Sequence, residues 1–184
     1  MDDSGSPPRL VALGGGTGLA TLLRAVKRLP LGSLSAIVTV SDDGGSSGRL
    51  RQEFDMPPPG DVRNCLVALA EDDELLTRLF AFRLPGEGPT GGHPLGNLFM
   101  TALHHLTGDF PRAVRLAAEV LRVRGAVLPA TGDKVTLIGE SASGRLLVGE
   151  TAITHGGPPR RVWLEPATPR ALPEALAAIA AAEV

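Results

Sequence analysis

Cysteine, aromatic residues and lysine are all scarce in this chain of 184 residues. The single cysteine, Cys65, excludes an internal disulfide bond and leaves no Cys/His cluster for zinc. Aromatic residues make up only 3% and tyrosine is absent, so few rings are available to stack on single-stranded bases. The net charge of −2 is also unlike that of a broadly nucleic-acid-binding protein. We therefore expect no nucleic-acid partner.

Long apolar runs and targeting signals are missing as well. No hydrophobic stretch approaches the roughly 18 residues that a membrane helix needs, so we expect no membrane insertion. Residues 1–8 are polar and acidic, unlike a signal peptide, and we expect them to be a disordered lead-in to a cytoplasmic protein. Residues 9–184 are long enough to form a single domain with a sizeable core, since 43% of the chain is hydrophobic.

The start of the chain predicts a strand, a helix and a second strand. Residues 9–13 form a short apolar run, and apolar residues then recur at helical spacing from Leu19 to Leu29, where Pro30 ends the pattern. A second apolar run covers residues 34–41. A strand–helix–strand unit of this kind predicts parallel pairing with a right-handed crossover.

The rest of the chain predicts helices and then an antiparallel hairpin. We expect helices at residues 62–71, 73–83, 95–107 and 170–182, and one opened by Asp109. In the helix at 73–83, one face is expected to carry Leu75, Leu76, Leu79 and Phe80. Residues 135–139 and 145–149 flank a short polar turn and predict a hairpin, with a further strand at 161–164. The fold class is therefore α/β, with an inserted antiparallel β-hairpin.

A glycine-rich turn separates the first strand from the first helix, and consists of Gly14, Gly15, Gly16, Thr17 and Gly18. The N-terminus of a helix attracts phosphate through its free N–H groups and its dipole. The turn lacks the dinucleotide-binding fingerprint, because the third required glycine falls on Leu19. We expect contact with phosphate or sugar, and the alternative is a simple tight turn.

A second polar segment follows the second strand, and consists of Ser41, Asp42, Asp43, Gly44, Gly45, Ser46, Ser47, Gly48 and Arg49. This composition is unsuited to a packed element and is typical of a loop that wraps a polar ligand at a strand end. Asp42 and Asp43 are candidates to accept hydrogen bonds from ribose hydroxyl groups, or to hold a Mg²⁺ ion against the phosphates of a ligand. The third interpretation is a turn in which the Asp42 and Asp43 side chains hydrogen-bond only to the neighbouring backbone.

Further candidates lie in two later polar turns. Arg49 and Arg63 are suited to phosphate oxygens, with solvated surface arginine as the alternative. Asp61 follows Gly60 and is placed to cap the helix after it, and Asn64 is a candidate ligand contact. His93 could hydrogen-bond a ligand or act as an acid or base. Cys65 is interpreted as a core residue, because no neighbour in the sequence forms a nucleophile–base pair with it.

Several motifs together resemble the gluconeogenesis factor family, in the superfamily that contains 2-phospho-L-lactate transferase. They are residues 13–19, 40–51, 58–66, 92–98 and 123–131, and the resemblance runs from about Leu10 to Val184. It implies a Rossmann-like parallel sheet flanked by helices. It also implies that the two glycine-rich segments hold a ligand, with Asp61, Asn64, His93 and Asn97 completing the wall of the site. Family members continue with another strand and a glycine-rich loop, so we expect this chain to lack the family's C-terminal part.

The resemblance implies a regulatory protein for cell shape and wall synthesis during gluconeogenic growth. Its expected ligand is a nucleotide-sugar such as UDP-N-acetylglucosamine, or an NAD-like dinucleotide, and a homo-oligomer is expected. No cofactor or metal is required, and we assign no catalytic residue because no base–nucleophile pair is evident in the sequence. The alternative is a Mg²⁺-dependent phospho-transferase that resembles 2-phospho-L-lactate transferase. A tubulin-like GTPase is a weaker interpretation of the glycine-rich turn.

Overall fold

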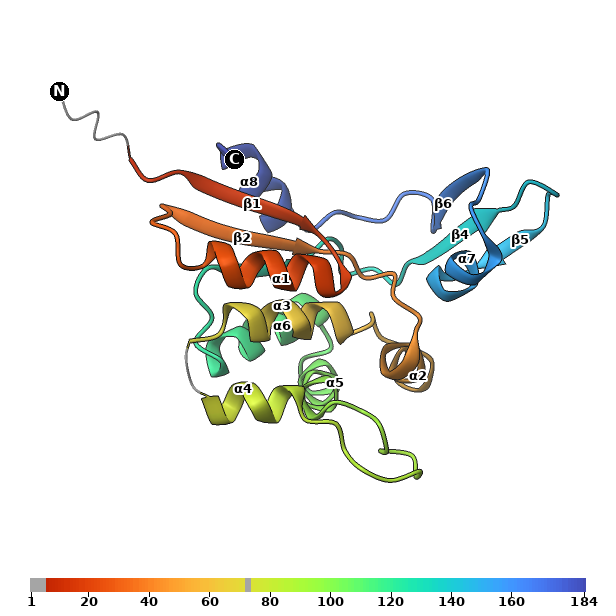
Figure 1. The fold of residues 1–184 in the computed structure, drawn as a ribbon, viewed down its shortest axis with the longest axis horizontal. Helices are drawn as coiled ribbons and strands as arrows, with labels where there is room; N and C mark the ends of the chain where they lie inside the picture. The colour runs from red at the N-terminus through yellow and green to blue at the C-terminus, as the bar shows by residue number, and fades with distance from the viewer. Residues whose placement is uncertain (1–5, 72–73) are drawn as a thin grey trace.

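A parallel sheet of three strands is the centre of the computed structural model, which describes residues 6–71 and 74–184. Strands β1 (Arg9–Gly14), β2 (Ser33–Val38) and β3 (Ala126–Pro129) pair in parallel in the order β1-β2-β3 (Figure 1). Helix α1 (Gly16–Val26) connects the first two strands, so the strand–helix–strand prediction is confirmed. Residues 1–5 of the expected lead-in lie outside the described residues.

Helices cover both faces of this sheet. Helices α1, α3 (Gly60–Leu69) and α6 (Phe110–Val120) lie on one face, and α8 (Pro173–Ala181) lies on the other (Figure 1). Helices α4 (Glu74–Ala81) and α5 (Leu95–Thr107) pack outside the first group. The α/β class with a helix-flanked parallel sheet is therefore confirmed. No helix among the described residues is long and apolar enough to cross a membrane.

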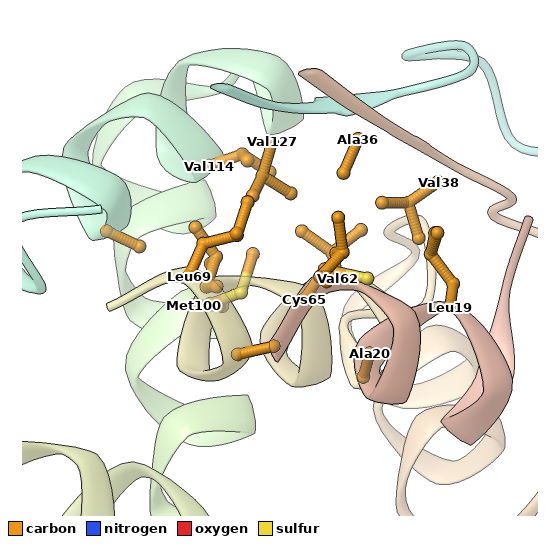
Figure 2. Close-up of a cluster of buried hydrophobic side chains, with 14 of the residues drawn as sticks. Leu19, Ala20, Ala36, Val38, Val62, Cys65, Leu69, Met100, Val114 and Val127 are labelled. Atoms are coloured by element: carbon orange, nitrogen blue, oxygen red, sulfur yellow. The ribbon is translucent and has the colours of Figure 1, made fainter. Parts of the chain in front are cut away.

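The main hydrophobic core fills the space between the sheet and helices α1 and α3. Figure 2 shows Val38 of β2 facing Leu19 of α1 and Val62 of α3. Cys65 lies in the same cluster and is fully buried, which confirms its interpretation as a core residue. Burying an aliphatic side chain of this size stabilises a fold by about 1.5–3 kcal/mol, so this cluster fixes how the helices sit against the sheet.

The second sheet is antiparallel and has the strand order β5-β4-β6. Strands β4 (Thr136–Glu140) and β5 (Leu146–Val148) form the predicted hairpin, and β6 (Arg161–Glu165) pairs with the other edge of β4. Helix α7 (Glu150–Gly156) packs on this sheet. The inserted hairpin is thus confirmed, and it belongs to a small layer of its own.

Two polar contacts attach this layer to helix α2 (Gly45–Phe54) and the loop before it. Asp43 Oδ1 accepts hydrogen bonds from the backbone N–H and the hydroxyl of Thr151, at 2.8 and 2.7 Å. Arg51 Nη2 donates to Thr136 Oγ1 at 2.7 Å. Asp43 therefore joins the segment after β2 to the first turn of α7.

The prediction that residues 41–49 form a loop is wrong for its second half. Helix α2 begins at Gly45, after a short turn in which the Gly44 N–H donates to Asp42 Oδ1 at 2.9 Å. The helix is poor in apolar residues, but Leu50 is only 1% exposed, and Ser46, Ser47 and Gly48 are also buried. Tertiary packing of this short face outweighs the weak local helix propensity.

Other expectations differ from the structure in detail. Helix α1 begins at Gly16, inside the glycine-rich turn, and not after it. Strand β3 and helix α7 were not predicted. On α4, Phe80 is buried, but Leu75 is 69% exposed and Leu79 is 40% exposed, so the expected apolar face packs only in part.

Candidate functional site

The carboxyl ends of β1 and β2 meet the first turns of α1 and α3. The Thr39 N–H, just after β2, donates to the Gly14 carbonyl at 2.9 Å. Gly15 lies so close to the side chains of Thr39 and Asp61 that a Cβ on it would approach Asp61 Oδ2 to 2.8 Å. A residue without a side chain is therefore needed at this position. The predicted glycine-rich turn and Asp61 are adjacent in the fold.

Asp61 does not cap α3, contrary to the sequence prediction. The N-cap residue is Pro59, without a side-chain capping bond, and Asp61 lies in the first turn of the helix. Its carboxylate instead accepts the backbone N–H of Gly16 at the start of α1. Burial raises the pKa of Asp61 above its usual value, and the negative charge of Asp42 acts in the same direction. Asp61 thus connects the first turns of two helices.

Several carboxylates face the same region. Burial raises the pKa of Glu150, and the charges of Asp42, Asp61 and Asp43 raise it further, in that order. Asp42 Oδ2 lies near the start of α3, where a Cβ on Gly60 would be 3.2 Å away. Among residues 6–71 and 74–184, no group of three or more His, Cys, Asp or Glu side chains has an arrangement that could hold a metal ion.

A buried polar network connects the first turns of α2 and α5. Ser46 Oγ lies 2.7 Å from His93 Nδ1, and Asn97 Nδ2 donates to the same Ser46 oxygen at 3.0 Å. With a neutral His93 ring whose Nδ1 carries no proton, the Ser46 hydroxyl donates to that nitrogen while it accepts from Asn97. Burial lowers the pKa of His93, and the positive charge of Arg49 lowers it further, so the neutral ring that this bond requires is favoured.

The Ser46–His93 contact is one that the sequence analysis did not identify. The two residues are 47 positions apart, which hides the pair from any local pattern. Both are buried: Ser46 is 9% exposed and His93 is 2% exposed. The third member of the network, Asn97, has a buried Oδ1 without a hydrogen-bond partner within the described residues.

The predicted arginines lie around this network. Arg63 is only 8% exposed, and burial, together with the charge of Arg83, lowers its pKa to about 10. Its Nη2 donates to Asn64 Oδ1 at 2.7 Å, while its buried Nε has no partner within the described residues. Arg49 Nη2 donates to the Gly91 carbonyl at 2.8 Å. A buried guanidinium with an unused donor is suited to an anion.

The remaining predicted site residues differ in how close they lie to the first turns of α1, α2 and α3. Ser47 is buried against Gly60, and Asp43 is occupied by Thr151. Thr17 and Gly18 are exposed in the first turn of α1, and nothing lies within 4 Å of a Cβ on Gly18. Cys65 is not a nucleophile here, because burial raises the pKa of its thiol to about 12.

Three polar residues of this region were missed by the sequence reasoning: Thr39, Arg83 and Glu150. Thr39 was counted as part of a strand, although it immediately precedes the polar segment. Arg83 Nη1 donates to the Gly92 carbonyl at 2.8 Å, which joins the segment after α4 to the His93 turn. Glu150 follows Gly149 at the start of α7, where an acid in the first turn is favoured, but the pair Gly139–Glu140 lies in β4, so a glycine followed by an acid does not by itself mark a helix start.

Comparisons with known proteins agree on one family. The family model described as "2-phospho-L-lactate transferase CofD" matches residues 10–184. A putative gluconeogenesis factor from Nostoc sp. is 54% identical over 96% of this chain and 39% of its own length. The gluconeogenesis factor of Bacillus subtilis is 46% identical over 98% of this chain and 57% of its own length.

A solved structure agrees with these relatives. The crystal structure of protein BH3568 from Bacillus halodurans has a TM-score of 0.91 and 48% identity, over 96% of this chain and 57% of that chain. The described fold is therefore shared with an experimental structure. The chain spans about half the length of the curated relatives it matches.

Proposed function

Since the chain belongs to the 2-phospho-L-lactate transferase CofD family and its relatives are named gluconeogenesis factors, we propose that it binds a nucleotide-sugar or a related dinucleotide. Among these ligands, we propose UDP-N-acetylglucosamine as the first to test. The observation that carries this proposal is the unused hydrogen-bonding capacity of two buried polar groups, Arg63 Nε in the first turn of α3 and Asn97 Oδ1 in the first turn of α5. Such groups are costly to bury unless a ligand or water meets them.

The two parts of such a ligand match two kinds of group in this region. The first turns of α1 and α2 supply N–H groups and the positive ends of helix dipoles, which favour phosphate. Arg63 adds a buried positive charge. The carboxylates of Asp42 and Asp61 are suited to accept hydrogen bonds from the hydroxyl groups of a sugar. We assign the diphosphate to the helix starts and the sugar to the acids.

The role we propose for this binding is regulatory. In this account the protein is cytoplasmic, forms a homo-oligomer and couples nucleotide-sugar levels to cell shape and wall synthesis during gluconeogenic growth. No cofactor is required for the binding step. The name of the relatives supports the metabolic context.

A Mg²⁺-dependent phospho-transferase is the second candidate, and the grouping of Asp42, Asp61 and Glu150 favours it. The fit to a metal is poor, because the described residues hold no arrangement of three such side chains that could bind an ion. We therefore derive no magnesium-dependent step.

A thermal-shift comparison separates the two candidates. A ligand at 100 times its dissociation constant stabilises the folded state by about 2.7 kcal/mol, which is a rise in melting temperature of roughly 5–10 °C for a chain of this size. We expect UDP-N-acetylglucosamine to give this shift in the presence of EDTA. A shift that requires Mg²⁺, accompanied by turnover of a phosphorylated substrate, would support the transferase.

A pair of matched variants tests the site. Asp42→Asn and Asp55→Asn each remove one carboxylate, but Asp55 lies at the opposite end of α2 and forms an exposed ion pair with Lys134. We expect Asp42→Asn to weaken the ligand-induced shift and Asp55→Asn to leave it unchanged. Equal shifts in the two variants would contradict the assignment of Asp42.

A further inference from the structure

The antiparallel layer, residues 136–165, lies to one side of the parallel sheet (Figure 1). Its three strands pair with β4 at the centre, and α7 packs on β4 and β5. Within the described part of the chain, neither α7 nor any strand of the layer packs extensively on a helix or strand of the main body. The layer therefore has the internal bonding to move as one unit.

Two short connectors join this layer to the main body, one between β3 and β4 and the other between β6 and α8. They start side by side, because Thr131 and Ala171 form an isolated antiparallel bridge. Asp133 then holds the connectors together, since its carboxylate accepts the Arg170 backbone N–H at 2.8 Å and Arg170 Nη2 at 2.9 Å. Paired connectors of this kind can act as a hinge.

The joint between the layer and the main body is incompletely packed. Leu164 of β6 packs against the edge of the main core, but a pocket of about 170 Å³ lies beside it, with Val40 of the main body on its wall. Protein interiors are normally filled to about the density of an organic crystal, with few voids larger than a water molecule. A rotation of the layer about the hinge therefore breaks few close contacts at this joint.

Asp43 forms a latch between the layer and the polar segment after β2. Its Oδ1 accepts both the Thr151 backbone N–H and the Thr151 hydroxyl, at 2.8 and 2.7 Å. Arg51 also donates to the layer, but it does so at Thr136, where β4 leaves the connector. Because one oxygen of one side chain accepts both bonds from Thr151, a rotation of the Asp43 side chain is enough to release α7.

The latch also fixes the position of Glu150, the residue before Thr151 in α7. Burial raises the pKa of Glu150, and the negative charges of Asp42 and Asp61 raise it further, so its carboxylate lies near theirs in the latched layer. The sugar of the ligand is assigned to Asp42 and Asp61. The latched layer thus adds a third carboxylate that can accept hydrogen bonds from sugar hydroxyl groups.

We propose that the antiparallel layer is a hinged lid, which is latched by Asp43 and carries Glu150 to the sugar of the bound ligand when it closes. The contact with Glu150 rests on the proposed nucleotide-sugar function, whereas the hinge and the latch do not depend on the identity of the ligand. The inference adds a moving part and one ligand contact to the site.

Distances between pairs of spin labels measure the movement of the lid. Ala142→Cys places a label in the exposed β4–β5 turn, and Arg28→Cys places its partner at an exposed position after α1. Ala177→Cys, exposed on α8, forms a control pair with Arg28→Cys inside the main body. Cys65 is fully buried and does not compete for the label. We expect the lid pair to show a second distance, which saturating UDP-N-acetylglucosamine removes, and the body pair to show a single distance throughout.

Two alanine variants test the latch at equal backbone strain. Gly149 and Gly144 both have positive φ, +93° and +82°, but only a Cβ on Gly149 would overlap the Asp43 carboxylate, and nothing lies within 4 Å of one on Gly144. We expect Gly149→Ala to raise the ratio of open to closed lid roughly tenfold, as the loss of two hydrogen bonds permits. Its affinity for UDP-N-acetylglucosamine should fall about twofold to tenfold, with the closed fraction. Gly144→Ala should match the wild type in both measurements.

Glu150→Gln tests the contact that the lid supplies. It should reduce the advantage of UDP-N-acetylglucosamine over UDP about threefold to tenfold, because UDP lacks the group that Glu150 contacts. An unchanged advantage would overturn the role of Glu150. A lid pair with the single distance of the body pair, in both the wild type and Gly149→Ala, would overturn the lid while leaving ligand binding intact. If the wild type bound neither UDP-N-acetylglucosamine nor UDP, the proposed function would fail, and the label distances would still decide whether the layer moves.

Discussion

Gly48 is the glycine whose replacement tests the geometry of the region most severely. It lies in α2, and a Cβ at this position would overlap the carbonyl oxygen of Asp43 and lie 2.7 Å from its carbonyl carbon. These are backbone atoms, so no side-chain rotation can relieve the overlap. The turn that carries Asp42 and Asp43 would have to move, and with it the contact between Asp43 and Thr151.

The expected magnitude follows from two opposing effects. Alanine in place of glycine inside a helix is favourable by about 1 kcal/mol. Overpacking of a buried position costs about 1–3 kcal/mol, or more when backbone must shift. Gly18→Ala provides the control, because Gly18 is also in the first turns of a helix but nothing lies within 4 Å of its added Cβ. We expect Gly18→Ala to be stabilised by about 0.5–1 kcal/mol and Gly48→Ala to be destabilised by about 1–2 kcal/mol.

Urea unfolding and thermal melting of both variants measure this difference. It corresponds to roughly 3–12 °C in melting temperature, at about 2–4 °C per kcal/mol for a chain of this length. Ligand titration of Gly48→Ala should also show weaker binding, since the Asp42 turn is displaced. If Gly48→Ala proved as stable as Gly18→Ala, the close approach of α2 to the Asp43 backbone would be refuted.

Three further predictions concern the residues around this turn. Asp43→Ala should cost about 1 kcal/mol and speed amide exchange in α7, because Thr151 loses two hydrogen bonds. Asp55→Asn is the control, because it removes only an exposed ion pair with Lys134 and asparagine tolerates the left-handed backbone at this position; equal exchange in α7 in both variants would contradict the role of Asp43. Burial lowers the pKa of His93, so the stability contributed by its neutral ring is complete above about pH 6.5 and is lost as the pH falls. His93→Gln should therefore lose less unfolding free energy than the wild type on acidification to about pH 5. An equal loss in the two proteins would argue against a neutral buried ring. Arg63→Met keeps an unbranched side chain near Phe80, so the free energy of unfolding should change by less than about 1 kcal/mol. The loss of the guanidinium should weaken UDP binding roughly tenfold. Unaltered UDP binding would show that Arg63 is not part of the ligand site.

Local sequence patterns predicted those elements whose signals lie within a few residues. The β1–α1–β2 unit follows from two apolar runs, a helical repeat and Pro30. The hairpin follows from its flanking apolar residues and the polar turn, and α6 from Asp109, whose side chain accepts the Arg112 N–H. In each case the residues that signal the element lie within or directly beside it, even where its pairing partner is further along the chain, as with β1 and β2.

Features that depend on distant partners were missed or misread. Helix α2 has few apolar residues, and its formation depends on Leu50 in the core and on close contacts with Gly60 and Asp43. Asp61 was read as a local cap because its partner, the Gly16 N–H, is far away in sequence. The Ser46–His93 bond spans 47 positions and Asp43–Thr151 spans 108. Residue type indicated that these positions are polar and special, but only the fold assigns their partners.

The most direct test of the central claim is a crystal structure of this chain grown with saturating UDP-N-acetylglucosamine and without Mg²⁺. We predict electron density for the diphosphate between residues 14–18 and the Asp42 turn, close to Arg63 and Asn97. Density for the ligand at another surface, or none at a concentration that saturates binding in solution, would contradict the account.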